Sequence, residues 1–195
     1  MDGPYFALLV GYLLGSLPFG LLLTRIFGKG DLRSIGSGSI GATNVLRTGS
    51  KGLAALTLLL DAAKGAVAVM LAQTYWPDAV NFAAAGALIG HLYPIWLRFR
   101  GGKGVATFFG ILIPLLPLAA AVYAALWIAV MIAVRISSVA GMAAAASAPL
   151  SAAVGGYEPL FPVLLGFALL IVWKHRENVQ RLKDGTEPRI GRRGT

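Results

Sequence analysis

The chain has 195 residues, of which 57% are hydrophobic and only 13% are charged, and its formal net charge at pH 7 is +9. So few charged residues cannot cover the surface of a soluble domain of this size, which predicts an integral membrane protein. The sequence has no cysteine and only two histidines. This excludes thiol nucleophiles, disulfides and cysteine-ligated metals, and we expect neither a metal nor a cofactor.

About seven apolar stretches are candidates for membrane-spanning helices, because crossing the hydrocarbon layer takes roughly 17 to 25 residues in a helix. The predicted fold class is therefore all-α, a polytopic transmembrane helical bundle. Pro114 and Pro117 interrupt one long apolar run and predict a reversal of the chain there. Because the later stretches are short, five or six spans is the alternative. The predicted spans are Tyr5–Leu23, Leu53–Ala72, Val80–Leu97, Val105–Leu118, Ala119–Val134, Val139–Ala153 and Leu160–Trp173.

The basic residues fall on one side of these spans. Of the 17 Lys and Arg residues, all but Lys64 lie in four polar segments, whereas the opposite ends carry Asp2, Asp78 and Glu158. The positive-inside rule then predicts an outer N-terminus and a cytoplasmic C-terminus. The first stretch is read as an uncleaved span, since no basic residue precedes it. The four basic segments are Thr24–Lys51, Arg98–Gly104, Arg135–Ser138 and Lys174–Thr195.

This topology accounts for the net charge better than nucleic-acid binding does, and it allows attraction to anionic membrane lipid. We expect no nucleic-acid partner. Residues 1–183 are predicted to form one membrane domain, and residues 184–195 a basic cytoplasmic tail.

A Gly- and Ser-rich stretch runs from Gly36 to Asn44 and is followed by Arg47. It contains the pattern G-x-G-x-x-G, but a membrane span precedes it in place of a strand, so we reject a dinucleotide fingerprint. Glycines let backbone N–H groups approach an anion, and hydroxyl, amide and guanidinium groups add donors. The stretch predicts a phosphate cradle, and an ordinary flexible connector is the alternative. The candidate ligands are Ser37, Gly38, Ser39, Asn44 and Arg47.

A second polar group, Arg98 to Thr107, comes directly before an apolar run. Lys103 follows Gly102 and lies where a helix is predicted to begin. A cation is unfavourable at the positive end of a helix dipole, so its position favours an anion bound between the two. The alternative is an interfacial lysine that extends its ammonium group to water.

A third group continues the last predicted span from Lys174 to Leu182. His175 and Asn178 are three residues apart and share a helix face, which Arg176 and Arg181 flank. Histidine is the usual proton acceptor or orienting donor near neutral pH. A solvated basic cap on the last helix is the alternative.

Three further polar positions are predicted to be mainly structural. Lys64 follows Asp61 by three residues on one helix face, and we favour mutual neutralisation over catalysis. His91 is expected to pack or to orient the loop that begins at Arg98. Ser138, beside Arg135, forms a small fourth polar site, or else caps a helix.

Taken together, these motifs resemble the PlsY family of bacterial acyl-phosphate:glycerol-3-phosphate acyltransferases, from about Gly15 to Leu182. The family usually has Asn where this chain has Ser39, whose shorter side chain reaches less far. The motifs are Gly36-Ser-Gly-x-Ile-Gly-Ala-Thr-Asn-Val-Leu-Arg47, Leu60-Asp-x-x-Lys-Gly65, Gly90-His-x-x-Pro94, Phe99-Arg-Gly-Gly-Lys-Gly-Val-Ala-Thr107, Ser137-Ser138 and His175-Arg-x-Asn-x-x-Arg-Leu182.

The resemblance implies transfer of a fatty acyl group from acyl phosphate to the 1-hydroxyl of glycerol 3-phosphate, giving lysophosphatidic acid and phosphate. It implies a bacterial inner-membrane enzyme with a cytoplasmic active site, and a soluble enzyme that supplies the acyl phosphate. It leaves open whether His175 or a substrate phosphate oxygen takes the hydroxyl proton. An organic-phosphate transporter is the competing class.

The resemblance also implies roles for individual residues. Lys103, His175 and Asn178 are the expected catalytic residues. The Ser37–Gly38 backbone and Lys103 would bind the acyl phosphate. Glycerol 3-phosphate would be held by Arg47, Ser138, His175 and Asn178. The expected substrate-binding residues are Ser37, Gly38, Ser39, Asn44, Arg47, Gly102, Ser138 and Arg176.

Overall fold

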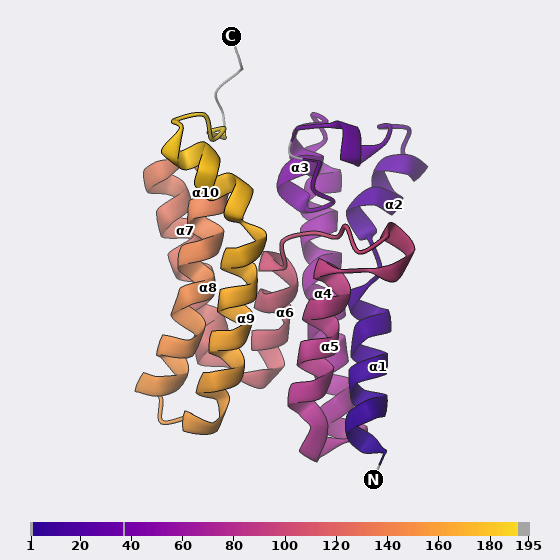
Figure 1. The fold of residues 1–195 in the computed structure, drawn as a ribbon, viewed down its shortest axis with the longest axis vertical. Coiled ribbons are helices and arrows are strands. Elements are labelled where there is room, and N and C mark those ends of the chain that lie inside the picture. Colours follow the sequence, from indigo (N-terminus) through magenta and orange to yellow (C-terminus); the bar gives the residue numbers. More distant parts are fainter. Residues whose placement is uncertain (1, 37, 191–195) are drawn as a thin grey trace. The chain divides into compact units, whose positions relative to one another are not determined.

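The computed structural model describes residues 2–36 and 38–190, and within these residues all regular structure is helical (Figure 1). The prediction of an all-α fold is confirmed. The chain divides into two compact units, one ending at Leu115 and the other beginning at Leu116. Each unit carries part of the predicted site.

The first unit packs its helices at close range. α1 lies along α5, and α4 contacts α1, α5 and α6 (Figure 1). A Cβ atom at Gly11 would overlap the backbone of Ala83, and one at Gly15 would overlap the backbone of Ala87. Small residues of this kind let membrane helices approach closely. The helices are α1 (Gly3–Gly15), α2 (Phe19–Ile26), α3 (Ala42–Leu46), α4 (Lys51–Tyr75), α5 (Val80–Leu92) and α6 (Val105–Leu115), with short 3₁₀ turns at Leu32–Ser34, Pro77–Ala79 and Ile95–Leu97.

The second unit is built around α8, which packs against both α7 and α9. α10 leaves α9 at His175 with a bend of 54°. The sequence had predicted that this segment continues the last span, so the bend is a correction. The helices are α7 (Pro117–Val134), α8 (Ser137–Val154), α9 (Phe161–Lys174) and α10 (Arg176–Lys183), with a 3₁₀ turn at Glu158–Leu160.

A helix break at the prolines is confirmed, because α6 ends at Leu115 and α7 begins at Pro117. The predicted reversal of chain direction there stays a prediction. By length and composition, five helical segments of the described residues could cross a membrane, with Gly3–Ile26 and Pro77–Leu97 each counted as one segment. The count is six if the bent pair Glu158–Lys174 and Arg176–Lys183 forms one span. α6 is a shorter apolar helix of 11 residues. The count of seven spans and the orientation of the termini remain predictions.

Candidate functional site

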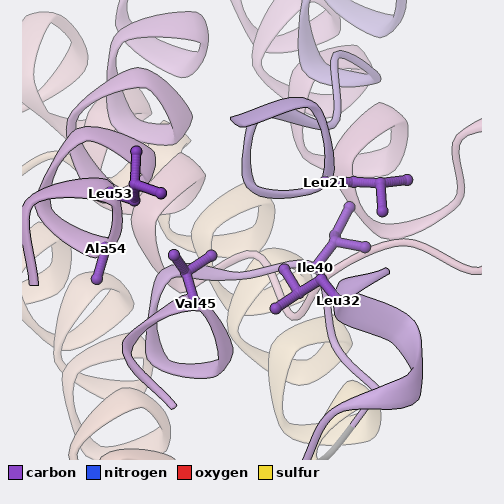
Figure 2. Close-up of a cluster of buried hydrophobic side chains, with 6 residues drawn as sticks. All are labelled: Leu21, Leu32, Ile40, Val45, Leu53 and Ala54. Carbon is purple, nitrogen blue, oxygen red and sulfur yellow. The ribbon is translucent and has the colours of Figure 1, made fainter. Parts of the chain in front are cut away.

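The loop between α2 and α4 is anchored by apolar side chains at intervals along it. Figure 2 shows Leu32, Ile40 and Val45 of the loop in one buried cluster with Leu21 of α2 and with Leu53 and Ala54 of α4. Burying a side chain of this size stabilises the fold by about 1.5 to 3 kcal/mol. Between these anchors, Arg33, Ser34, Gly36 and Gly38 are exposed, whereas Asn44 is buried.

Asn44 holds this loop together from within. Its side chain is buried, and its Nδ2 donates to the carbonyl oxygens of Leu32, Ile35 and Ser39 at 2.9, 2.9 and 2.8 Å. Its Oδ1 accepts from Nη1 of Arg47 at 3.3 Å. The amide therefore serves the backbone of the loop and orients Arg47.

The predicted cradle residues have mixed surroundings. Ser37 lies outside the described residues. Gly38 has a φ of +66°, which favours glycine, and its N–H donates to the carbonyl of Ile35 at 2.9 Å to close a turn. The hydroxyl of Ser39 accepts from the N–H of Gly41 at 3.4 Å. In this conformation, the N–H of Gly38 is used within the loop.

The Gly- and Ser-rich stretch around Gly38 and the polar segment that begins at Arg98 meet at an open pocket of about 670 Å³. Gly38 lies on its wall together with three arginines, namely Arg33, Arg98 and Arg100. Asp31 also lines it and pairs with Arg33 at 2.6 Å. The hydrogen bonds from Arg33 hold the pKa of that carboxyl well below its usual range. The pocket therefore has an excess of positive charge, as an anion site needs.

Lys103 follows Arg100 by three residues and comes two residues before α6 begins at Val105, as predicted. The glycines ahead of it follow the end of α5 closely. The N–H of Gly101 donates to the carbonyl of Leu92 at 3.2 Å, and that of Gly102 to the carbonyl of His91 at 3.0 Å. A Cβ atom at Gly102 would overlap the imidazole of His91. Glycine is thus required where the loop presses on that ring.

A buried chain of polar groups supports His91. Nζ of Lys64 donates to Oδ1 of Asp61 at 2.7 Å and to Nδ1 of His91 at 2.8 Å. It also donates to the carbonyl of Leu17 at 2.8 Å, between α1 and α2. Because an ammonium group only donates, Nδ1 of His91 must accept, and a proton on the ring is at Nε2, which faces Gly102. This arrangement supports the predicted structural role.

In the second unit, His175 is buried at the junction of α9 and α10. Its Nδ1 donates to the carbonyl oxygen of Ile171 at 2.8 Å. Since that oxygen can only accept, the proton of the neutral ring lies on Nδ1, and Nε2 is the acceptor. The same carbonyl also accepts from the backbone N–H of His175 at 3.1 Å.

Ser138 and Asn178 meet at a third residue, Glu187. Ser138 Oγ and Asn178 Nδ2 both donate to Oε1 of Glu187 at 2.6 Å. Ile136 is the N-cap of α8, so Ser138 is not the helix cap considered from the sequence. Arg176 is exposed and stacks over the ring of Trp173, with its guanidinium carbon 5.2 Å from the ring centroid.

Comparison with known proteins assigns the chain to a family. The family model described as glycerol-3-phosphate acyltransferase matches residues 5–185. The chain belongs to this family. A glycerol-3-phosphate acyltransferase from Brucella anthropi is 51% identical over 188 residues, covering 96% of this chain and 94% of the relative. One from Erythrobacter litoralis is 53% identical over 188 residues, covering 96% and 95%.

Solved structures agree with this membership of the glycerol-3-phosphate acyltransferase family. The glycerol 3-phosphate form of PlsY (YgiH), an integral membrane glycerol 3-phosphate acyltransferase, has a TM-score of 0.91 and 35% identity, with 96% of each chain covered. Its lysophosphatidic acid form has a TM-score of 0.88 and 34% identity, with 96% and 95% covered. The predicted PlsY resemblance and the predicted multi-pass helical membrane protein are confirmed.

Several residues near the predicted ones were not singled out from the sequence as site residues. Arg33, Arg98 and Arg100 line the pocket, and Thr107, near the start of α6, has a buried hydroxyl without a partner among the described residues. Glu187 joins Ser138 to Asn178. The signal for Glu187 was available in Gly185, since a glycine just after a helix predicts a reversal of the chain.

Proposed function

We propose that the protein is a membrane enzyme that transfers a fatty acyl group from an acyl phosphate to the 1-hydroxyl of glycerol 3-phosphate. The products are lysophosphatidic acid and inorganic phosphate. Membership of the glycerol-3-phosphate acyltransferase family supports this reaction over the transporter alternative. The structural observation that carries the proposal is the basic pocket where the Gly38 loop meets the Arg98 loop.

The chemistry asks for positioning and charge stabilisation more than for a protein nucleophile. An acyl phosphate is already an activated mixed anhydride, so the glycerol oxygen attacks its carbonyl carbon directly. The new C–O ester bond forms, the C–O bond to phosphate breaks, and the hydroxyl proton ends on the released phosphate. Fixed cations beside the departing group lower the barrier, because they stabilise charge that develops in the transition state.

The basic groups of the first unit suit the phosphate of the donor. Arg33, Arg98 and Arg100 line the pocket. We assign Lys103 to the departing phosphate, since it lies at the positive N-terminal end of α6, where an anion is favoured. Asn44 would act through the loop and through Arg47, because its amide is committed to backbone carbonyls.

The groups of the second unit suit the acceptor substrate. We assign Ser138, His175 and Asn178 to glycerol 3-phosphate. His175 would orient the 1-hydroxyl by accepting its hydrogen bond at Nε2, because the proton on Nδ1 is held by the carbonyl of Ile171. Arg176, which is exposed at the start of α10, would attract the phosphate from solution.

We further assign this chemistry to the cytoplasmic side of a bacterial inner membrane. Basic segments gather at one end within each unit, and the positive-inside rule assigns such basic segments to the cytoplasmic side. Glycerol 3-phosphate and a soluble enzyme that makes the acyl phosphate would both reach that side.

The decisive experiment compares acyl donors. The purified protein in lipid nanodiscs receives glycerol 3-phosphate with palmitoyl phosphate, palmitoyl-CoA or palmitoyl carrier protein, and lysophosphatidic acid is measured. We expect product from palmitoyl phosphate alone. Product from the thioesters alone would refute the assigned donor, and no product from any donor with folded protein would refute the reaction.

A further inference from the structure

The chain after α10 turns back onto the second unit in a fixed conformation. Gly185 has a φ of +68°, its N–H donates to the carbonyl of Leu182 at 3.2 Å, and the N–H of Thr186 donates to the carbonyl of Arg181 at 2.8 Å. This is the pair of bonds that defines a Schellman motif at a helix C-terminus. The N–H of Glu187 also donates to the carbonyl of Arg181, at 3.1 Å. The backbone therefore fixes the position of Glu187.

The carboxylate of Glu187 is surrounded by donors. Its side chain is only 4% exposed. Oε1 accepts from both Ser138 and Asn178, and Oε2 accepts from Nε of Arg181 at 2.7 Å. Burial alone would raise the pKa of Glu187, but the hydrogen bonds from these three residues outweigh it and lower the pKa. The group is thus an ionised carboxylate at neutral pH.

An ionised carboxylate dictates how its partners are oriented, because it accepts hydrogen bonds and cannot donate them. Ser138 has one hydroxyl proton, and that proton is directed at Glu187. Toward any other group, Ser138 can only accept. Asn178 must present its NH₂ group to Glu187, so its carbonyl oxygen Oδ1 is turned away from the carboxylate.

We propose that Glu187 is a positioning residue that makes Ser138 and Asn178 acceptors for the hydroxyl groups of glycerol 3-phosphate. The inference rests on the proposed function, and it assigns the glycerol end of that substrate to Ser138 and Asn178. Hydroxyl groups donate to such acceptors. Phosphate oxygens only accept, so Ser138, whose single proton is used on Glu187, has none to offer them, and the buried negative charge of Glu187 repels them. The phosphate end therefore binds to cations elsewhere.

The test measures equilibrium binding of glycerol 3-phosphate and of propyl phosphate, which lacks both hydroxyl groups, to the full-length protein in nanodiscs. In Glu187→Gln, one amide oxygen cannot accept from all three donors, so the preference for glycerol 3-phosphate should fall about tenfold. Glu177→Gln is the matched control, because it makes the same substitution at an exposed position on α10, and it should keep the wild-type preference. Partial unfolding would weaken both ligands equally and leave their ratio unchanged.

An unchanged preference in Glu187→Gln would overturn the inference, as would a wild type without preference. Tighter binding of glycerol 3-phosphate to Glu187→Gln would also overturn it, because the carboxylate would then be competing with the substrate phosphate.

Ser138→Ala gives a second test, which does not depend on the folding of the first variant. It should lose part of the preference for glycerol 3-phosphate but bind inorganic phosphate as the wild type does. Weaker binding of inorganic phosphate would show that Ser138 donates to phosphate and would overturn the inference. The binding measurement does not require acyl transfer. If the preference for glycerol 3-phosphate depends on Glu187 as expected but no acyl group is transferred, the proposed reaction alone is refuted. Transfer with a preference independent of Glu187 would refute the inference alone.

Discussion

Lys103 is the single cation whose position best suits the departing phosphate. It precedes α6, and the glycines before it are hydrogen-bonded to the end of α5. Removing a charge that stabilises the transition state costs about 10² to 10³ in rate, so Lys103→Ala should lower kcat/KM for palmitoyl phosphate by that factor. Asp78→Asn, at an exposed position in the turn between α4 and α5, should retain wild-type rates. Near-normal turnover of Lys103→Ala would remove Lys103 from the chemistry.

His175 provides a second prediction at the residue scale. His175→Ala removes both the acceptor at Nε2 and the bond to the carbonyl of Ile171. We expect kcat to fall by about 10²-fold, in line with the loss of an orienting catalytic group. Thermal unfolding in detergent should show only a small loss of stability, since one hydrogen bond contributes about 1 kcal/mol. A large loss of stability with kcat retained would make His175 purely structural.

The role of a residue can be predicted from the sequence only where the groups that it contacts are close to it in the chain. Lys103 could be placed before a helix because the apolar run after it is local. Asn44 was predicted to bind phosphate because its amide offers hydrogen-bond donors. Its Nδ2 instead donates to the carbonyl oxygen of Leu32 at 2.9 Å, a contact that only the folded loop creates. Ser138 and Glu187 are 49 residues apart, so no local pattern predicts their contact.

At the scale of elements, Lys64 ties three parts of the first unit together. It bonds Asp61 within α4, the carbonyl of Leu17 between α1 and α2, and His91 of α5. Removing one partner of a buried ion pair leaves an uncompensated charge and costs about 3 to 5 kcal/mol. We therefore expect Lys64→Met to lower the unfolding temperature in detergent strongly.

The double variant Asp61→Leu/Lys64→Met removes both charges and provides the control. It should be more stable than Lys64→Met alone, because no unpaired carboxylate remains. If the two variants are equally unstable, the buried charge of Asp61 is not what destabilises Lys64→Met. The effect would then come from the lost bonds to Leu17 and His91.

Helix boundaries were predictable where prolines or long apolar runs set them. The break between α6 and α7 near Pro114 and Pro117 is of this kind, because a proline ring interrupts helical hydrogen bonding. The separation of α1 from α2 and the bend at His175 were not predicted. Pro18 lies at the first of these breaks and is a signal that the prediction of one span over Tyr5–Leu23 did not use. No proline marks the bend at His175, where the side chain bonds to the carbonyl of Ile171.

For the molecule as a whole, each unit assembles its polar chemistry from segments far apart in the chain. In the first unit, the loop after α2 and the loop after α5 line one basic pocket. In the second, the N–H of Ile190 donates to the carbonyl of Arg135 at 2.8 Å, which brings the segment after α10 to the start of α8. Basic residues that the sequence distributes over four segments are thus gathered at one end of each unit.

The predicted orientation in the membrane can be tested cleanly, because the chain has no native cysteine. Single cysteines introduced at Asp78 and Glu158 should react with a membrane-impermeant maleimide added to intact spheroplasts, since both are predicted to face outward. Cysteines introduced at Lys51 and Lys183 should react only after the membrane is opened. The reason is electrostatic: basic segments are retained on the cytoplasmic side during insertion. Labelling of Lys183→Cys in intact spheroplasts, with Asp78→Cys protected, would reverse the topology and put the glycerol 3-phosphate groups on the wrong side for a cytoplasmic substrate.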